Sequence, residues 1–183
     1  MAQRQAGEAS RASAFAGSSL AFARAWLLPL ALGVAAATLE VKIPLQLPGR
    51  NGLIWMSCLV AGRLASGNAV GGLVAGAGAF AGSIGGEVTS AIGFLAAGGV
   101  IDLLAPTSRW LRLGWAALAG TLGNLSILAV KLLAGQPPTA AATRGMSLTV
   151  ESYVAFGLLG GLIGALVVAM ATAATRRSRP SSG

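Results

Sequence analysis

Two polar side chains, Asn124 and Lys131, lie seven residues apart in the apolar segment 110–135. Seven residues make about two helical turns, so both side chains would lie on one helix face. Polar groups at membrane depth are costly and need a function or a partner. For Asn124 the alternatives are a hydrogen bond to a neighbouring helix or contact with a ligand. For Lys131 they are snorkelling to the lipid headgroups or lining a cavity.

A second set of polar and aromatic residues stands where apolar segments begin. Glu151 and Tyr153 open the last segment, and Arg50, Asn51 and Trp55 stand at the start of the second. A carboxylate at a helix start can simply complement the helix dipole, and a tryptophan there is typical of the membrane interface. These residue types favour binding over catalysis, because the chain has no histidine, nucleophile elbow or phosphate-binding loop. We expect no enzyme.

The composition is that of a chain surrounded by lipid. Of its 183 residues 55% are hydrophobic and 10% are charged, whereas soluble domains carry about 25% charged residues. We therefore expect an all-α integral membrane protein, and the mean hydropathy of +0.74 agrees. With Cys58 as the single cysteine and no histidine, no disulfide, metal site or cofactor is expected.

The net charge of +8 is concentrated near the two ends of the chain. Six arginines lie there, at Arg4, Arg11, Arg24, Arg176, Arg177 and Arg179. Basic ends on an apolar chain indicate membrane topology signals, and we expect no nucleic-acid partner.

Six apolar segments predict a bundle of six transmembrane helices in the lipid bilayer. Their approximate ranges are 21–40, 51–65, 67–86, 89–105, 110–135 and 151–174. The second has about 15 residues, fewer than the roughly 20 that a perpendicular helix needs, so it is tilted, begins deeper or spans only half of the bilayer. The transmembrane domain is expected over 19–175, between a polar, disordered segment 1–18 and a basic tail 176–183.

The basic residues also set the expected orientation. With six spans and a cytoplasmic N-terminus, nine basic residues fall inside and four fall outside, namely Lys42, Arg50, Lys131 and Arg144. This asymmetry follows the positive-inside rule. With five spans, one of the two basic termini would lie on the exterior side, against the rule. We expect a multi-pass protein of the cell membrane with both termini cytoplasmic.

Rows of small residues spaced four apart occur in three of the segments. The pairs are Gly72/Gly76, Gly78/Gly82, Gly157/Gly161 and Gly160/Gly164, and a softer row consists of Ala25, Pro29, Gly33 and Ala37. Such rows allow close approach of a neighbouring backbone, either inside the bundle or on another membrane subunit. Internal packing is favoured for most of them. Segment 67–86 has small residues on nearly all of its faces, more than one neighbouring helix can use, which favours another membrane subunit as a partner.

Two further features carry expectations. The stretch "LQLPGRNG" contains Pro48 and Gly49, which disfavour helix and permit a sharp turn. It is either a lid over a binding site or a plain exterior loop, and we favour the lid. Asp102 stands close in sequence to Arg109 and Arg112, which predicts a structural ion pair or a subunit contact.

Three stretches together resemble the substrate-binding S components of energy-coupling factor (ECF) vitamin transporters. They are "KIPLQLPGRNGLIW", "GGVIDLLAP" and "AGTLGNLSILAVKLLAG", and the likeness extends over about residues 20–175. The resemblance implies a six-helix bundle whose first loop covers a pocket built by the later helices. It also implies coupling to a membrane T component and two cytoplasmic ABC ATPases.

Carried onto this chain, the resemblance assigns roles to individual residues. Arg50, Asn51, Trp55, Asn124, Lys131, Glu151 and Tyr153 would bind a small-molecule substrate, and the row Ala25, Pro29, Gly33 and Ala37 would be the coupling face. The expected function is capture of a small organic, vitamin-like micronutrient from the exterior, and Arg50 and Lys131 favour an anionic or polar one. The alternative is a small scaffold that holds a larger membrane complex together through its glycine-rich faces.

Overall fold

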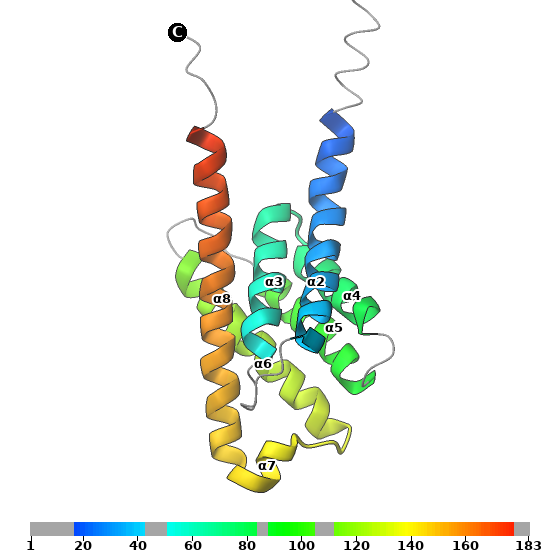
Figure 1. Ribbon diagram of the computed structural model, residues 1–183, viewed down its shortest axis with the longest axis vertical. Helices are drawn as coiled ribbons and strands as arrows, with labels where there is room; N and C mark the ends of the chain where they lie inside the picture. The colour runs from blue at the N-terminus through cyan, green and yellow to red at the C-terminus, as the bar shows by residue number, and fades with distance from the viewer. Residues whose placement is uncertain (1–16, 43–50, 84–87, 105–111, 178–183) are drawn as a thin grey trace, which may run out of the picture.

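The computed structural model describes residues 17–42, 51–83, 88–104 and 112–177, and every regular element in these ranges is a helix (Figure 1). Residues 17–22 are helical and lead into the π-helical turn η1 (Ala23–Leu27) and then α2 (Leu28–Lys42). The other helices are α3 (Asn51–Ser66), α4 (Gly71–Gly82), α5 (Val88–Leu103), α6 (Arg112–Leu133), α7 (Thr139–Arg144) and α8 (Met146–Arg177). The all-α class is confirmed for the residues described.

Within the described residues, three helices are long and apolar enough to cross a membrane, which indicates a membrane protein. They cover Gly17–Leu39, Arg112–Leu133 and Met146–Arg177. The helices α4 and α5 are apolar but shorter. The weak second segment forms the 16-residue helix α3, about 24 Å long against a hydrocarbon core of about 30 Å.

The short helix α3 lies at the centre of the bundle. It contacts each of α2, α4, α5, α6 and α8. Trp55, Met56, Leu59 and Val60 are all buried almost completely, and they form much of the core. Because protein surrounds this helix on all sides, it can be shorter and more polar than a helix that faces lipid.

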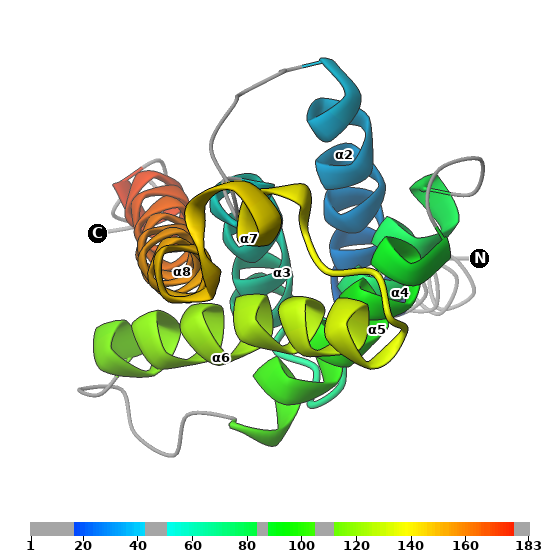
Figure 2. The same cartoon turned by 90° about the horizontal axis from the view of Figure 1, so that it is seen from below.

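The long helices give the molecule its outline. Residue 17 and residue 177 lie at the same end of the molecule, where both helices extend past α3 (Figure 1). The helix α6 runs obliquely across α8, and α7 lies at the opposite end, close to where α8 begins (Figures 1 and 2).

Several boundaries differ from the expected ones, each for a local reason. The third segment narrows to the 12-residue α4, because Gly67, with φ of 65°, ends α3 and begins a turn. The helix α7, which was not expected, begins after Pro138 in an alanine-rich stretch. Gly145, with φ of 88°, separates α7 from α8. Gly17 and Ser18, placed in the disordered segment by the sequence analysis, are helical, and so are Arg176 and Arg177 of the expected tail.

The turn η1 follows from Pro29. Proline has no backbone N–H and its ring crowds the carbonyl four residues earlier, here that of Ala25. The chain widens by one residue at this point, and the Leu28 N–H donates to the Ala23 carbonyl oxygen, five residues back. The Ala25 carbonyl accepts a long hydrogen bond of 3.4 Å from Asn68 Nδ2 in the turn between α3 and α4.

Small residues bring the helices into backbone contact on two sides of α4. A side chain at Gly76 would meet the Phe94 carbonyl of α5 at 2.5 Å, and one at Gly82 would meet Ala37 of α2 at 2.8 Å. The surface that favoured an external partner is thus divided between α2 and α5. This part of the sequence interpretation is corrected, because two neighbours within the chain use these faces.

The two rows on α8 serve two neighbours in the same way. Gly157 packs against α6, where an added side chain would meet the Gly120 carbonyl at 2.6 Å. Gly160 and Gly164 pack against α3, and Ser57 Oγ donates to the Gly160 carbonyl oxygen at 3.0 Å. Internal packing, the favoured alternative for these rows, is what the structure has.

Candidate functional site

Asn124 joins three helices in the core. Its side chain is 2% exposed, and its Nδ2 donates to the Tyr153 carbonyl oxygen of α8 at 2.8 Å. Gly52 of α3 lies so close that an added Cβ would sit 2.5 Å from the Asn124 Cγ atom. Of the two alternatives for Asn124, the interhelical hydrogen bond is therefore present. The same contact brings the first turn of α3 against α6 and α8.

Trp55 is a core residue and is not part of the molecular surface. It is 1% exposed, and its ring stacks on that of Phe94 of α5, with ring centroids 3.6 Å apart and an interplanar angle of 14°. Its Nε1 is buried and has no hydrogen-bond partner among the residues described. A buried donor without an acceptor costs about 1–3 kcal/mol, so a water or a ligand acceptor would stabilise it. Trp115 of α6 carries a second indole N–H of this kind.

The remaining expected site residues are distributed around the end of the bundle near α7. Tyr153 is buried in the first part of α8, and Glu151, two residues before it, is exposed. Lys131 is half-buried in the last turn of α6, and Asn51 is half-buried as the first residue of α3. Arg50 and most of the expected lid, residues 45–50, lie outside the described residues.

The structure thus brings some of the expected site together. The first turn of α3, Asn124 and Tyr153 meet directly, and Trp55 lies one helical turn beyond Asn51 on α3. The start of α8 and the end of α6, which carry Glu151 and Lys131, lie at the same end of the bundle (Figure 1).

The row expected to couple to another subunit packs inside the chain. Pro29, Gly33 and Ala37 are buried. A Cβ at Gly33 would sit 2.7 Å from the Ala79 backbone nitrogen of α4. Ala25 is half-buried beside the turn after α3. The expectation of a free coupling face along this row is corrected, because close backbone packing against α4 occupies it.

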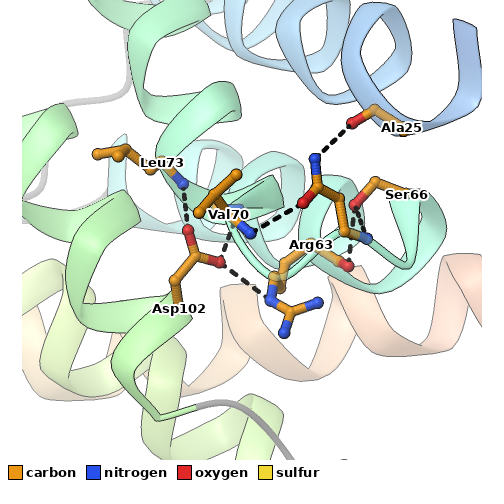
Figure 3. Close-up of polar contacts among 8 residues, drawn as sticks. Ala25, Arg63, Ser66, Val70, Leu73 and Asp102 are labelled. Carbon is orange, nitrogen blue, oxygen red and sulfur yellow. Dashed lines mark hydrogen bonds and ion pairs between the residues drawn. The ribbon is translucent and has the colours of Figure 1, made fainter. Parts of the chain in front are cut away.

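A polar network that the sequence analysis did not foresee joins α3, α4 and α5 (Figure 3). Asp102, in the last turn of α5, accepts hydrogen bonds from the backbone N–H groups of Gly72, at 2.9 Å, and Leu73, at 2.7 Å. Arg63 Nε lies 3.0 Å from Asp102 Oδ1. The Nε–H is not well aligned with this oxygen, so the contact is an ion pair more than a directed hydrogen bond.

Asp102 therefore acts as a cap for α4 supplied by another helix. The first N–H groups of a helix have no partner within it, and a carboxylate there also complements the helix dipole. The expected ion pair exists, and the basic member that the structure describes is Arg63. Arg109, which is closer in sequence, lies outside the described residues. In the sequence, Arg63 is the only charged residue of the expected span 51–65. That signal could have identified it as the partner of Asp102.

Two further bonds tie the same turn to the first long helix. Arg24 Nε donates to the Ala65 carbonyl oxygen at 2.8 Å, and Asn68 bonds the Ala25 carbonyl. Together with the Asp102 network, these bonds fix the end of α3 and the start of α4 to the first long helix on one side and to α5 on the other.

In the part of the chain that the structure describes, no group of three or more histidine, cysteine, aspartate or glutamate side chains is placed to hold a metal ion. Comparison of the chain with models of protein families, with curated proteins and with solved structures gives no match.

Proposed function

We propose that this chain is a membrane-embedded, non-enzymatic subunit that captures a small organic micronutrient from the exterior for uptake by an ECF-type ABC transporter. The observation that supports this most is the junction of α3, α6 and α8, where Gly52, Asn124 and Tyr153 meet. Polar groups from helices far apart in the sequence converge there within apolar surroundings. Ligand sites in helix bundles are built from such convergence.

The orphan indole N–H of Trp55 adds to this support. It lies on the same helix as Gly52, one turn further into the core, and it lacks an acceptor among the residues described. A ligand bound at this junction would supply one. Lys131, in the last turn of α6, and Arg50, which immediately precedes α3 in the sequence, motivate an anionic or polar ligand, because ammonium and guanidinium groups attract negative charge.

The proposal includes six crossings, both termini in the cytoplasm, and a membrane T component with two cytoplasmic ABC ATPases as partners. It is supported by the position of residues 17 and 177 at one end of the molecule (Figure 1), as an even number of crossings requires. Because α4 covers the Gly33 row, a T component would contact the exposed apolar face of α2 that carries Leu30 and Val34.

The scaffold alternative has less support. It relied on glycine-rich faces open to other proteins, and the rows on α4 and α8 pack against α2, α3, α5 and α6. A scaffold of this kind would retain no small molecule during purification.

Ligand retention tests the proposal directly. The full chain is purified in mild detergent, and small molecules released by denaturation are identified by mass spectrometry. We expect one organic compound at near-stoichiometric amount. Lys131→Ala should weaken its binding about tenfold, the loss of one charge-assisted contact. Arg112→Ala, which removes an exposed charge from the far end of α6, should leave binding unchanged.

Two outcomes would contradict the proposal. One is a chain that retains no ligand and binds none when it is screened against vitamin-like compounds. The other is cysteine labelling, in a Cys58→Ala background, that finds the two chain ends in opposite compartments.

A further inference from the structure

Arg63 is held by one edge of its guanidinium group. The Asp102 carboxylate is fixed by the N–H groups of Gly72 and Leu73, and it meets Arg63 at Nε. Figure 3 shows the two terminal nitrogens of Arg63 pointing away from Asp102. Among the residues that the structure describes, these terminal nitrogens have no protein acceptor. The group therefore presents a second, pre-oriented edge with four N–H donors.

The depth of Arg63 follows from the packing of α3 on α8, which run in the same direction (Figure 1). Gly164 packs between Ser57 and Ala61, so Arg63 is level with about residue 168. From there α8 continues for eight residues to Arg176, about 12 Å at the rise of an α-helix.

The first long helix gives a similar depth. Arg24 bonds the Ala65 carbonyl of α3, and this helix extends seven residues further, to Gly17, about 10 Å. By the rise of an α-helix, both long helices thus extend roughly 10–12 Å beyond the level of the ion pair. Figure 1 shows both of them continuing past the end of α3.

The parts of the helices that rise past Arg63 are suited to lipid. Leu20 and Phe22 on the first helix, and Val167 and Met170 on α8, are each more than half exposed. With Arg176 and Arg177 at headgroup level, the free edge of Arg63 lies about 10 Å below it. Such a charge is accommodated when the bilayer thins locally and a headgroup descends to it.

We propose that this edge of Arg63 binds the phosphate of an anionic phospholipid from the leaflet next to residues 17 and 177. Planar guanidinium groups bind phosphate through two parallel hydrogen bonds. An ammonium-bearing, zwitterionic headgroup is less suitable, since Asp102 is the nearest carboxylate of the described chain and both its oxygens are already engaged. A lipid phosphate brings its own acyl chains to the exposed leucine, phenylalanine and valine side chains, which a free phosphate ion does not.

The inference is tested on the full chain in nanodiscs of phosphatidylcholine, with and without added phosphatidylglycerol. We expect phosphatidylglycerol to raise the unfolding temperature and to remain bound in native mass spectrometry. Arg63→Lys keeps a charge beside Asp102 but loses the second edge, and it should lower the apparent affinity for phosphatidylglycerol about tenfold. Loss of one bidentate contact is an effect of this order.

The matched control removes charge without touching the network. The double variant Arg176→Gln/Arg177→Gln loses two exposed basic residues at the end of α8 and should keep most of the phosphatidylglycerol effect. If instead the double variant loses the effect and Arg63→Lys keeps it, general surface charge is responsible and the proposal is overturned.

Two further arms of the experiment distinguish a phospholipid headgroup from other sources of phosphate. Equal stabilisation by inorganic phosphate would assign the edge to a soluble anion, and equal stabilisation by pure phosphatidylcholine would remove the requirement for an anionic headgroup. Either result overturns the proposal. Should Arg63→Lys fail to fold, the count of phosphatidylglycerol molecules retained by the wild type and by the double variant still decides it. Retention of none by the wild type is incompatible with the site.

Discussion

Replacing Gly161 by alanine tests whether backbone contact between α6 and α8 holds the junction at Asn124 together. A Cβ at Gly161 would overlap the Ala116 carbonyl oxygen and lie 2.8 Å from the Ala116 carbonyl carbon. Non-bonded carbons lie about 3.5–4.0 Å apart, so the helices must separate by about 1 Å. Overpacking of this kind costs about 1–3 kcal/mol.

The control is Gly114→Ala on the exposed side of α6. An added Cβ at Gly114 meets nothing within 4 Å, and alanine is the better helix former by about 1 kcal/mol. We therefore expect Gly114→Ala to leave stability unchanged or raise it by up to about 1 kcal/mol. The same propensity gain acts at Gly161, so the difference in stability between the two variants measures the steric term.

Unfolding by sodium dodecyl sulfate in mixed micelles, followed by circular dichroism, gives the free energies for both variants. Separation of the helices should also lengthen the bond from Asn124 Nδ2 to the Tyr153 carbonyl, so ligand retention should fall with Gly161→Ala and not with Gly114→Ala. Equal unfolding midpoints for the two variants would refute the close contact between α6 and α8.

Three further predictions concern single polar groups. Asp102→Ala removes the cap of α4 and leaves Arg63 unpaired, and it should destabilise the chain by about 3–5 kcal/mol in the same assay; a loss below 1 kcal/mol would contradict the network. Asn124→Ala removes one interhelical hydrogen bond and should cost about 1 kcal/mol, whereas an unchanged midpoint would mean that this bond adds nothing. Trp55→Phe keeps an aromatic ring beside Phe94 but deletes the orphan N–H, so it should weaken ligand retention while Trp115→Phe does not; equal effects would deny Trp55 a ligand contact.

Periodicity and charge predicted where helices occur along the chain better than they predicted which helices pack against each other. The helix α3 was expected to be short, because its apolar segment, 51–65, has only about 15 residues. The sequence does not say that α3 is central, since its apolar pattern is the same whether the surroundings are lipid or protein. The pairing of Arg63 with Asp102 was missed because 39 residues separate them, and only the fold makes them neighbours.

The candidate site shows the same limit. Spacing placed Asn124 and Lys131 on one face of α6, but the choice between a hydrogen bond and a ligand contact depends on what faces them. Asn124 faces the Tyr153 carbonyl and Gly52. Residue spacing along the chain could not identify either of them as a neighbour of Asn124. For Trp55, which stands close to the start of a span, the alternatives were a position at the membrane interface and contact with a substrate. The stack on Phe94, contributed by α5, draws it into the core instead.

The central helix α3 links two polar sites of the bundle. Its first turn meets Asn124 and Tyr153, and its last turn meets Asp102 through Arg63. Both ends are held by polar contacts, and glycines bring α8 against the backbone between them. A displacement of α3 along its axis would therefore strain both networks at once. Events at the Asn124 junction and at Arg63 should be coupled, because one short, closely packed helix carries both.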